Sequence, residues 1–330
     1  MAPNDSDDNP ARSGTPNADP MVRPRYTGLA SFMRTPYRAI DQGGWDGVEI
    51  GLIGVPFDGG VTNRTGARHG PREIRNQSSF IRKINQATGI APHDLCSVAD
   101  LGDAWIEKPF ELKGALDEIA AFFTQVHERG ITPLSAGGDH AVTLPILRAI
   151  AQERPLGLIH FDAHCDTGDD YLGSKLHHGV PFRRAVEEGL LDPKRCIQIG
   201  IRGSVNELDQ WAFSHEQGMR VIYIEEFHEL GVAGVIVEAQ RVIGTGPAYV
   251  SFDVDGLDPV YAPGTGTPEV GGFSTLEAQL MLRGLSGLDL VGGDVVEVSP
   301  PFDPTGNTAL VGATMMFEIL CLLAQARSAR

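Results

Sequence analysis

The segment Phe161-Asp162-Ala163-His164-Cys165-Asp166-Thr167 follows directly on a run of strand-forming residues, Leu156–Phe161. If the extended backbone continues for a few residues, alternate side chains share one face, so Asp162, His164 and Asp166 point together. Two carboxylates and an imidazole suit a divalent cation that prefers oxygen and nitrogen ligands. The alternative is a polar strand end that caps the next helix, but three ionisable groups on one face then repel or desolvate one another. The pattern therefore predicts a metal site with further ligands elsewhere in the chain.

A second acidic cluster ends another expected strand, in Ser251-Phe252-Asp253-Val254-Asp255-Gly256-Leu257-Asp258-Pro259. By the same alternation, Asp253 and Asp255 share a face. His140 follows a third expected strand, in Gly137-Gly138-Asp139-His140. Each motif alone is weak evidence for a metal. Because the carboxyl ends of parallel strands meet at one edge of a sheet, we expect these side chains to converge.

Together the three motifs supply four carboxylates and two imidazoles, from His140, Asp162, His164, Asp166, Asp253 and Asp255. This set is too large for a four-coordinate zinc ion and fits two metal ions that share bridging carboxylates. Four negative charges balance two divalent cations, so a cluster that is prohibitive when empty becomes neutral when loaded. Oxygen ligands with some imidazole favour two Mn²⁺ per chain, with Ni²⁺, cobalt or iron as alternatives.

Strand-like and helix-like segments alternate along the chain. Strands are expected at residues 48–55, 95–101, 131–136, 156–161, 196–201, 221–224, 248–252 and 290–298, and the clearest helices at 112–128, 143–152 and 308–326. This alternation predicts an α/β fold with a parallel sheet that is covered on both faces. Residues 1–22, rich in Pro, Asp, Asn and Ser, are expected to form a disordered tail, and residues 23–330 a single domain.

The composition narrows the function and the compartment. The chain has 330 residues, 42% of them apolar, and a net charge of −16. This charge speaks against nucleic acid or an anionic membrane as a partner and is compatible with a cationic substrate. The apolar run 308–326 is interrupted by Glu318, so we expect a helix buried against the sheet rather than a membrane span.

The cysteines and the N-terminus bear on the compartment. The four cysteines lack paired metal-type spacing and lie mostly in apolar runs: Cys96, Cys165, Cys196 and Cys321. We therefore expect buried, reduced thiols, with Cys165 facing away from the acidic cluster. The N-terminus lacks the order of a secretory signal. Both features predict a cytoplasmic location.

Two further residues are candidates for catalysis. His178, in Leu176-His177-His178-Gly179, follows the first acidic cluster by a short loop and could move protons beside the metals, although a surface loop histidine is the simpler interpretation. Glu297 ends the last expected strand among apolar neighbours, in Asp294-Val295-Val296-Glu297-Val298. A carboxylate in that setting needs a cationic or hydrogen-bonding partner.

The motifs Gly-Gly-Asp-His, Asp-Ala-His-x-Asp and Ser-Phe-Asp-Val-Asp-x-Leu-Asp-Pro, in this order, resemble the signature of the ureohydrolase family, the arginases and agmatinases. The resemblance covers about residues 45 to 326. It implies a three-layer α/β/α fold around an eight-stranded parallel sheet, assembled as trimers or hexamers. It also implies a hydrolase that releases urea and an amine from a linear guanidino compound.

The resemblance further implies a role for each matching residue. One manganese ion would be held by His140, Asp162, Asp166 and Asp253, and the other by Asp162, His164, Asp253 and Asp255. His178 matches the proton-shuttling histidine of the family, with Asp166 beside it, and Glu297 matches the glutamate that binds the guanidinium group. A non-catalytic subunit that supports a related partner chain is an alternative, which the intact set of ligands disfavours.

The substrate is the harder question. The Asn-rich and Ser-rich loop of arginases is not evident in residues 167–175, which makes arginine an unexpected substrate. The stretch His177–Arg184 and the loop Asp58–Arg72 are similar to those of agmatinases and bacterial guanidino-acid hydrolases, and Tyr171 resembles the guanidinopropionase type. We expect Tyr171 to narrow the pocket for a short acid such as 3-guanidinopropionate or 4-guanidinobutyrate, with Arg64 or Arg72 attracting the carboxylate. Agmatine, or a substituted guanidine or biguanide such as metformin, is the alternative. A mixed oligomer with a related chain is possible beside the expected homo-oligomer.

Overall fold

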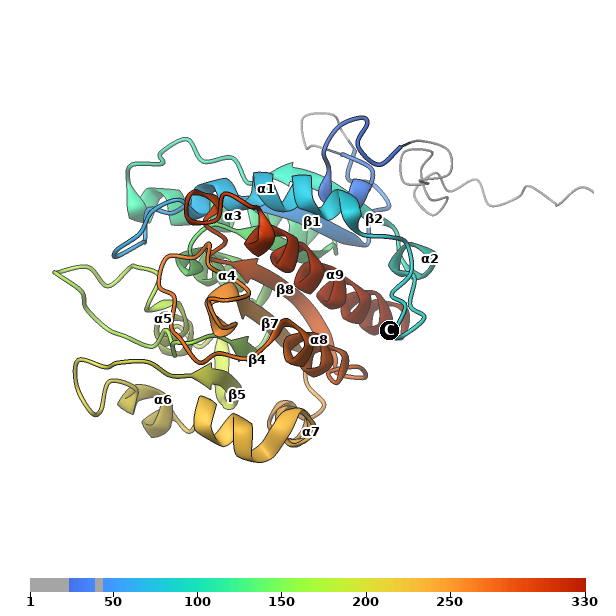
Figure 1. The fold of residues 1–330 in the computed structure, drawn as a ribbon. Helices are drawn as coiled ribbons and strands as arrows, with labels where there is room; N and C mark the ends of the chain where they lie inside the picture. Colours follow the sequence, from blue (N-terminus) through green and yellow to red (C-terminus); the bar gives the residue numbers. More distant parts are fainter. Residues whose placement is uncertain (1–23, 39–43) are drawn as a thin grey trace, which may run out of the picture.

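The structure, a computed structural model, describes residues 24–38 and 44–330. The tail expected at residues 1–22 lies outside these residues. The centre of the fold is one sheet of eight strands, and every neighbouring pair runs parallel (Figure 1). In chain order the strands are β1 (Ile50–Val55), β2 (Val98–Asp103), β3 (Thr132–Gly137), β4 (Leu156–Phe161), β5 (Leu191–Ile201), β6 (Arg220–Tyr223), β7 (Ala248–Asp253) and β8 (Leu290–Val296).

The order of the strands in the sheet decides which loops meet. It runs β2-β1-β3-β8-β7-β4-β5-β6, so β3, β8, β7 and β4 are consecutive neighbours in the middle. These four strands lead into the segments that carry His140, Glu297, Asp253 and Asp162. Because all four strands run in the same direction, their carboxyl ends place these side chains at one edge of the sheet.

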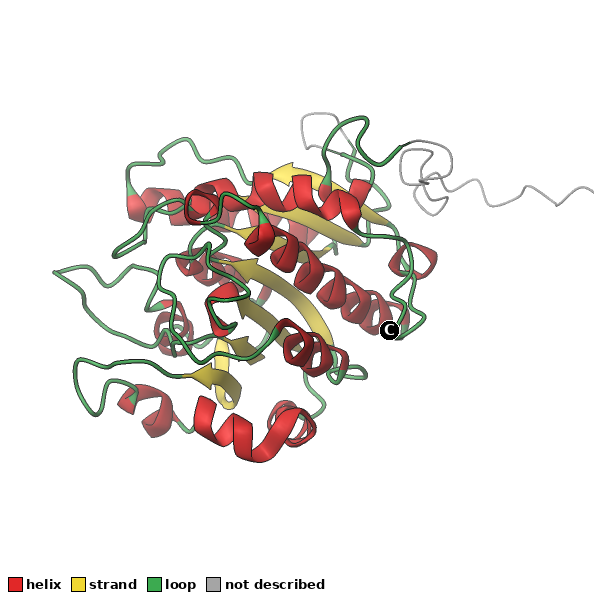
Figure 2. Cartoon of the chain, viewed as in Figure 1, coloured by secondary structure: helices red, strands yellow, loops and turns green. Residues whose placement is uncertain are grey.

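Helices cover both faces of the sheet, so the expected three-layer α/β/α arrangement is confirmed (Figure 2). In β1, Ile50 and Leu52 pack into one core while Ile53 and Val55 pack into the other, as the alternation of a strand requires. The first face is covered by α1 (Gly70–Gln77), α7 (Ile224–Ile243), α8 (Thr275–Arg283) and α9 (Asn307–Ser328). The second is covered by α3 (Leu112–Glu128), α4 (Thr143–Ile150) and α5 (Pro181–Glu187).

Some element boundaries differ from the expected ones. The strand expected from residue 95 begins at Val98, because Pro92 starts a short helix, α2 (Pro92–Leu95), and proline suits a first helical position. Strand β5 begins at Leu191, five residues before the expected start, in a stretch whose proline and charges do not look strand-like. The last helix not yet named, α6 (Ala212–Gln217), packs beside β5 and β6.

Helix α9 is the apolar segment near the C-terminus. It is long and apolar enough to cross a bilayer, but 72% of its most apolar window is buried in the protein. The helix packs along β8, so the expected core helix is confirmed. Its buried Glu318 accepts hydrogen bonds from Asn85 at 2.7 Å and from Arg283, which accounts for a carboxylate within an apolar run.

Candidate metal centre and its cavity

The backbone after β4 bends sharply, so the expectation that the strand simply continues is wrong. Residues 162–164 form a bend, and Asp166 has a left-handed backbone with φ of 50°. The bend is held by Asp162, whose Oδ1 accepts the amide hydrogen of His164 at 2.6 Å. The three side chains therefore converge through a turn capped by its own carboxylate rather than through strand alternation.

The segment after β7 repeats this arrangement. Asp253 Oδ1 accepts the amide hydrogen of Asp255 at 2.8 Å, which starts a short 3-10 turn, Val254–Gly256. Asp255 Oδ1 in turn accepts the amide hydrogen of Ala163 at 3.0 Å. This bond ties the two acidic turns together, so the backbone itself fixes how their carboxylates lie.

His140 lies at the centre of one group of carboxylates. Its Nδ1 is 3.2 Å from Asp162 Oδ2, 3.0 Å from Asp166 Oδ2 and 3.2 Å from Asp253 Oδ2. Despite these short distances, this buried nitrogen has no hydrogen-bond partner among the described residues, because it is aligned with none of the three oxygens. An imidazole nitrogen aimed between three carboxylate oxygens has the arrangement of a metal ligand.

The other nitrogen of His140 explains why Nδ1 can be a ligand. Nε2 is 2.8 Å from Ser251 Oγ, and Ser251 donates its hydroxyl hydrogen to Asp294 Oδ1 at 2.7 Å. The serine oxygen therefore accepts from His140, so the ring hydrogen is on Nε2 and Nδ1 keeps its lone pair. Asp294 is also bound by the hydroxyls of Thr143 and Tyr249. Neither Ser251 nor Asp294 was identified as part of the site from the sequence.

His164 lies in a second group of carboxylates. Its Nδ1 is 3.3 Å from Asp162 Oδ1 and 3.1 Å from Asp255 Oδ2. Asp162 thus offers one oxygen to the neighbourhood of His140 and the other to that of His164. The side chains of Asp162, His164 and Asp255 are close enough together to hold a metal ion. A carboxylate shared in this way is what a pair of adjacent metal ions requires.

The electrostatics of the cluster also fit bound cations. Burial, together with the carboxylates of Asp255 and Asp162, raises the pKa of Asp253 well above its usual range. Burial opposes a charge on His140, but its carboxylate neighbours raise its pKa well above the usual value, so they favour a positive charge at Nδ1, which a metal ion would supply in place of a proton. Buried carboxylates in mutual contact are costly unless protons or cations neutralise them. The donor set of oxygen and imidazole nitrogen fits divalent cations such as manganese or nickel.

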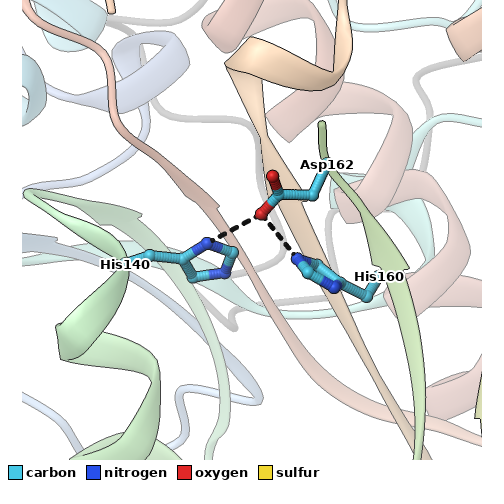
Figure 3. Close-up of side chains that lie close together, drawn as sticks. All are labelled: His140, His160 and Asp162. Carbon is cyan, nitrogen blue, oxygen red and sulfur yellow. Dashed lines mark hydrogen bonds and ion pairs between the residues drawn. The ribbon is translucent and has the colours of Figure 1, made fainter. Parts of the chain in front are cut away.

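A second buried histidine, His160, was missed in the sequence. Figure 3 shows it with His140 and Asp162, and its Nε2 is 2.7 Å from Asp162 Oδ2. It lies on β4, two positions before Asp162, so the alternation that was used to place the acidic side chains on one face also pointed to it. It could have been found by extending that pattern backward into the strand.

His178 and Glu297 lie together beside the cluster. His178 Nδ1 is 2.9 Å from Glu297 Oε1, and that oxygen also accepts the amide hydrogen of His140 at 2.9 Å. Burial opposes a charge on His178, but the Glu297 carboxylate raises its pKa to about 9. Glu297 Oε2 is buried and has no hydrogen-bond partner among the described residues. Glu297 also has a left-handed backbone, with φ of 63°, a strained geometry that is frequent at functional sites.

A cavity of about 510 Å³ opens onto these side chains. Its lining includes His164, Asp166, Asp253 and His178, and on the outer side Tyr171, His177, Asn206, Gln210 and Trp211. Tyr171 lies where the sequence predicted, at the cavity, with 49% of its surface exposed. Carboxylates of Asp169, Asp170, Glu207 and Asp209 also line it, whereas none of the described lining residues is Arg or Lys.

The two arginines expected to meet the substrate lie elsewhere. Neither Arg64 nor Arg72 lines the cavity. The Arg64 guanidinium lies 4.9 Å from the centre of the Phe302 ring, and Arg72 is exposed on α1. The loop between β1 and α1 is stabilised by the buried carboxylate of Asp58, which accepts hydrogen bonds from the backbone amides of Gly66 and Arg68. A long exposed side chain cannot be placed from its position in the sequence, which is why this expectation has no support here.

The fold and the site together define a class: a three-layer α/β/α protein whose parallel sheet presents a buried histidine and carboxylate cluster at the carboxyl ends of its central strands. Comparison with known sequences makes the assignment specific. Residues 48–322 match the arginase family, and the chain belongs to that family.

Individual relatives are similar over nearly the whole chain. A guanidinopropionase of Pseudomonas aeruginosa is 62% identical over 309 residues, 93% of this chain and 96% of the relative. A guanidinobutyrase of the same organism is 47% identical, over 91% and 94% of the two chains. Among solved structures, proclavaminate amidino hydrolase from Streptomyces clavuligerus aligns with a TM-score of 0.85 at 38% identity, over 92% of this chain and 99% of that chain.

Proposed function

We propose that this protein hydrolyses a linear guanidino compound, adding water to the guanidinium carbon and releasing urea and an amine. The observation that carries the proposal is the convergence of the six candidate ligands at one cavity, which His164, Asp166 and Asp253 line, with His140 Nδ1 aimed between three carboxylates. Membership of the arginase family and the similarity to a guanidinopropionase support it.

The proposed centre holds two divalent ions, Mn²⁺ or alternatively Ni²⁺. His140, Asp162, Asp166 and Asp253 would hold one and Asp162, His164, Asp253 and Asp255 the other. Divalent ions in such a site lower the pKa of bound water, so that a nucleophile is available near neutral pH. The protein's part is to fix the ligands, which the two capped turns do through the backbone.

Glu297 is proposed to orient the substrate. Its Oε1 is already taken by His178 and by the amide of His140, whereas Oε2 is buried and unpaired among the described residues. An unpaired buried carboxylate oxygen is costly, and an N–H of the guanidinium group would satisfy it with a charge-assisted hydrogen bond. The geometry therefore supports one hydrogen bond from the guanidinium group to Glu297, through Oε2.

His178, with Asp166 beside it at the cavity, is proposed to pass a proton to the leaving amine. The nitrogen that faces away from Glu297, Nε2, is 2.8 Å from the hydroxyl of Thr62. The backbone amide of Thr62 also donates to this nitrogen, at 3.2 Å, when the ring is neutral, and the hydroxyl can accept from it when the ring is protonated. A residue that gains and loses a proton in each turnover needs such an environment.

The substrate is proposed to be a short guanidino acid such as 3-guanidinopropionate or 4-guanidinobutyrate. Tyr171 at the outer wall and the 62% identity to a guanidinopropionase support this. Because Arg64 and Arg72 do not line the cavity, neutral donors there, among them Asn206, Gln210 and Tyr171, are the groups that would meet the carboxylate. One observation favours a second candidate: the acidic wall without Arg or Lys suits agmatine or a biguanide, which carry no acid group.

A turnover screen tests the function. The protein is reconstituted with Mn²⁺ and separately with Ni²⁺, and urea release is measured for 3-guanidinopropionate, 4-guanidinobutyrate, agmatine, arginine and a biguanide. We expect the highest kcat/KM for a short guanidino acid and the lowest for arginine. A preference for agmatine or the biguanide would replace the substrate proposal but keep the reaction. Tight metal binding without urea from any compound would favour the non-catalytic subunit.

The remaining expectations stay predictions. We propose a homo-oligomer, a trimer or hexamer, in the cytoplasm, on the strength of the family resemblance and the composition. Sedimentation of the metal-loaded protein tests the assembly, because a fully active monomer would contradict it.

A further inference from the structure

The buried imidazole of His160 has no part in the reaction proposed so far. It lies on β4 with none of its surface exposed, between Asp162 on one side and Gln198 of β5 on the other. Its position beside His140 and Asp162 resembles that of a metal ligand (Figure 3). Both of its nitrogens, however, already have protein partners. A histidine with both nitrogens engaged acts through its partners rather than on a metal.

The orientation of Gln198 decides the tautomer of His160. The Gln198 Nε2 atom is 2.5 Å from the carbonyl oxygen of Cys165 and 3.2 Å from His160 Nδ1. A carbonyl oxygen only accepts, so the amide nitrogen must face it, and its second hydrogen is directed to His160. Nδ1 of His160 therefore accepts, the ring hydrogen is on Nε2, and Nε2 donates to Asp162 Oδ2.

This orientation of the Gln198 side chain leaves one of its own polar atoms unpaired. Turned this way, Gln198 leaves its Oε1 buried without a hydrogen-bond partner among the described residues. A buried unpaired acceptor destabilises the fold. The ring of His160 is also held by Phe182, whose centroid is 4.3 Å away and which packs on His140 as well. Packing and hydrogen bonding thus both fix one orientation of the imidazole.

We propose that Gln198 and His160 form a positioning pair that fixes the Asp162 carboxylate as the bridge between the two metal positions. The inference rests on the proposed function, since it assumes that the site holds two ions. The pair holds Oδ2, the oxygen 3.2 Å from His140 Nδ1, and leaves Oδ1 to the side of His164. Loss of the pair should therefore weaken the metal position beside His140 more than the one beside His164.

Two substitutions separate the hydrogen bond from the packing. His160→Phe keeps a flat ring against Phe182 but removes the donor, whereas His160→Gln places an amide N–H within similar reach of Asp162. Mn²⁺ affinity is measured by competition with a chelator, and the unfolding temperature of the metal-free protein is recorded. We expect His160→Phe to bind the ion beside His140 about 10- to 100-fold less tightly than the unsubstituted protein does. His160→Gln should stay within about threefold of the unsubstituted protein.

A double-substitution cycle identifies the affected position. His140→Ala removes a ligand of one position and His164→Ala a ligand of the other. If His160 serves the position beside His140, His160→Phe changes nothing further in the His140→Ala background but weakens the remaining ion about 10- to 100-fold in the His164→Ala background. The opposite pattern would overturn the asymmetry, and equal losses for His160→Phe and His160→Gln would show that only packing matters.

Gln198→Met provides a second test if His160→Phe does not fold. It removes the amide while conserving volume, so the tautomer of His160 is no longer fixed. The affinity for the ion beside His140 should fall by a smaller factor than in His160→Phe. Unchanged affinity in Gln198→Met and His160→Phe would overturn the inference while leaving the proposed function intact. If the unsubstituted protein does not bind two ions, the proposed function itself fails. Failure of the proposed function can therefore be told apart from failure of the inference about Gln198 and His160.

Discussion

The floor and the rim of the cavity are built in different ways. The floor consists of the six candidate ligands. Its carboxylates accept hydrogen bonds from backbone amides, and the bond from Ala163 to Asp255 joins the segments that follow β4 and β7. The rim consists of residues 167–175 and 203–211, and its outer part is held by local contacts, such as the bridge between Tyr171 and Ser174. The exposed surface is 0% for Asp162 on the floor and 91% for Leu172 on the rim. A fixed floor and an adjustable rim let one chemistry serve different substrates.

Removing a floor carboxylate should have the largest effect. Asp255→Asn conserves the shape of the side chain and an oxygen for the Ala163 amide, but removes the charge beside His164. We expect kcat to fall at least about 10³-fold, because a metal ion contributes several kcal/mol of charge stabilisation, and we expect one ion per chain to be lost. Urea assays and elemental analysis on the same preparation check this. Full metal content with full activity would show that the floor is not interlocked as described.

Glu297→Gln should have the next largest effect. The amide oxygen can still accept from His140 and His178, so the local structure is kept, but the unpaired Oε2 and its charge are lost. We expect kcat/KM to fall by about 10²- to 10³-fold, the range for breaking one partner of a buried charged hydrogen bond. Metal content should not change. Loss of both metal and activity would assign Glu297 to the metal centre instead.

Tyr171→Met on the rim should change selectivity more than rate. A flexible thioether in place of the phenol widens the outer cavity, so the ratio of kcat/KM for 4-guanidinobutyrate over 3-guanidinopropionate should rise about tenfold, the usual effect of one methylene. Metal content and stability should stay the same. A ratio that does not move would remove Tyr171 from the account of specificity.

Cys165→Ala should have the smallest effect on function. The side chain of Cys165 is buried among Ile201 and Val221, away from the floor, although its neighbours in the sequence converge there. We expect unchanged metal content and rate, and a loss of about 1 kcal/mol in the free energy of unfolding from the small cavity. Metal loss in this variant would contradict the described direction of the side chain.

The contrast between floor and rim also separates what the sequence predicts well from what it predicts poorly. The sheet and the convergence of His140, Asp162 and Asp253 follow from strand patterns, since parallel strands end at one edge. The turn that brings His164 and Asp166 inward does not follow from that pattern, because Asp166 adopts a left-handed backbone.

The sequence analysis missed one kind of residue and misplaced another, for different reasons. The buried partners His160, Ser251 and Asp294 lie inside strands, where polar residues are easily assigned to the strand itself rather than to a site. The two arginines lie on or near an exposed loop, and their expected reach into the cavity depended on contacts that no local pattern encodes. Backbone-determined positions are therefore the ones that sequence reasoning locates best.

The metal content of fully active protein tests the central claim most directly. The chain is stripped of metal and titrated with Mn²⁺ while bound metal, by elemental analysis, and urea release are followed on the same samples. The proposed centre holds two ions, and Asp162 offers one oxygen to the side of His140 and the other to the side of His164. We predict that activity reaches its plateau at two ions per chain; a plateau at one ion per chain would contradict the binuclear centre.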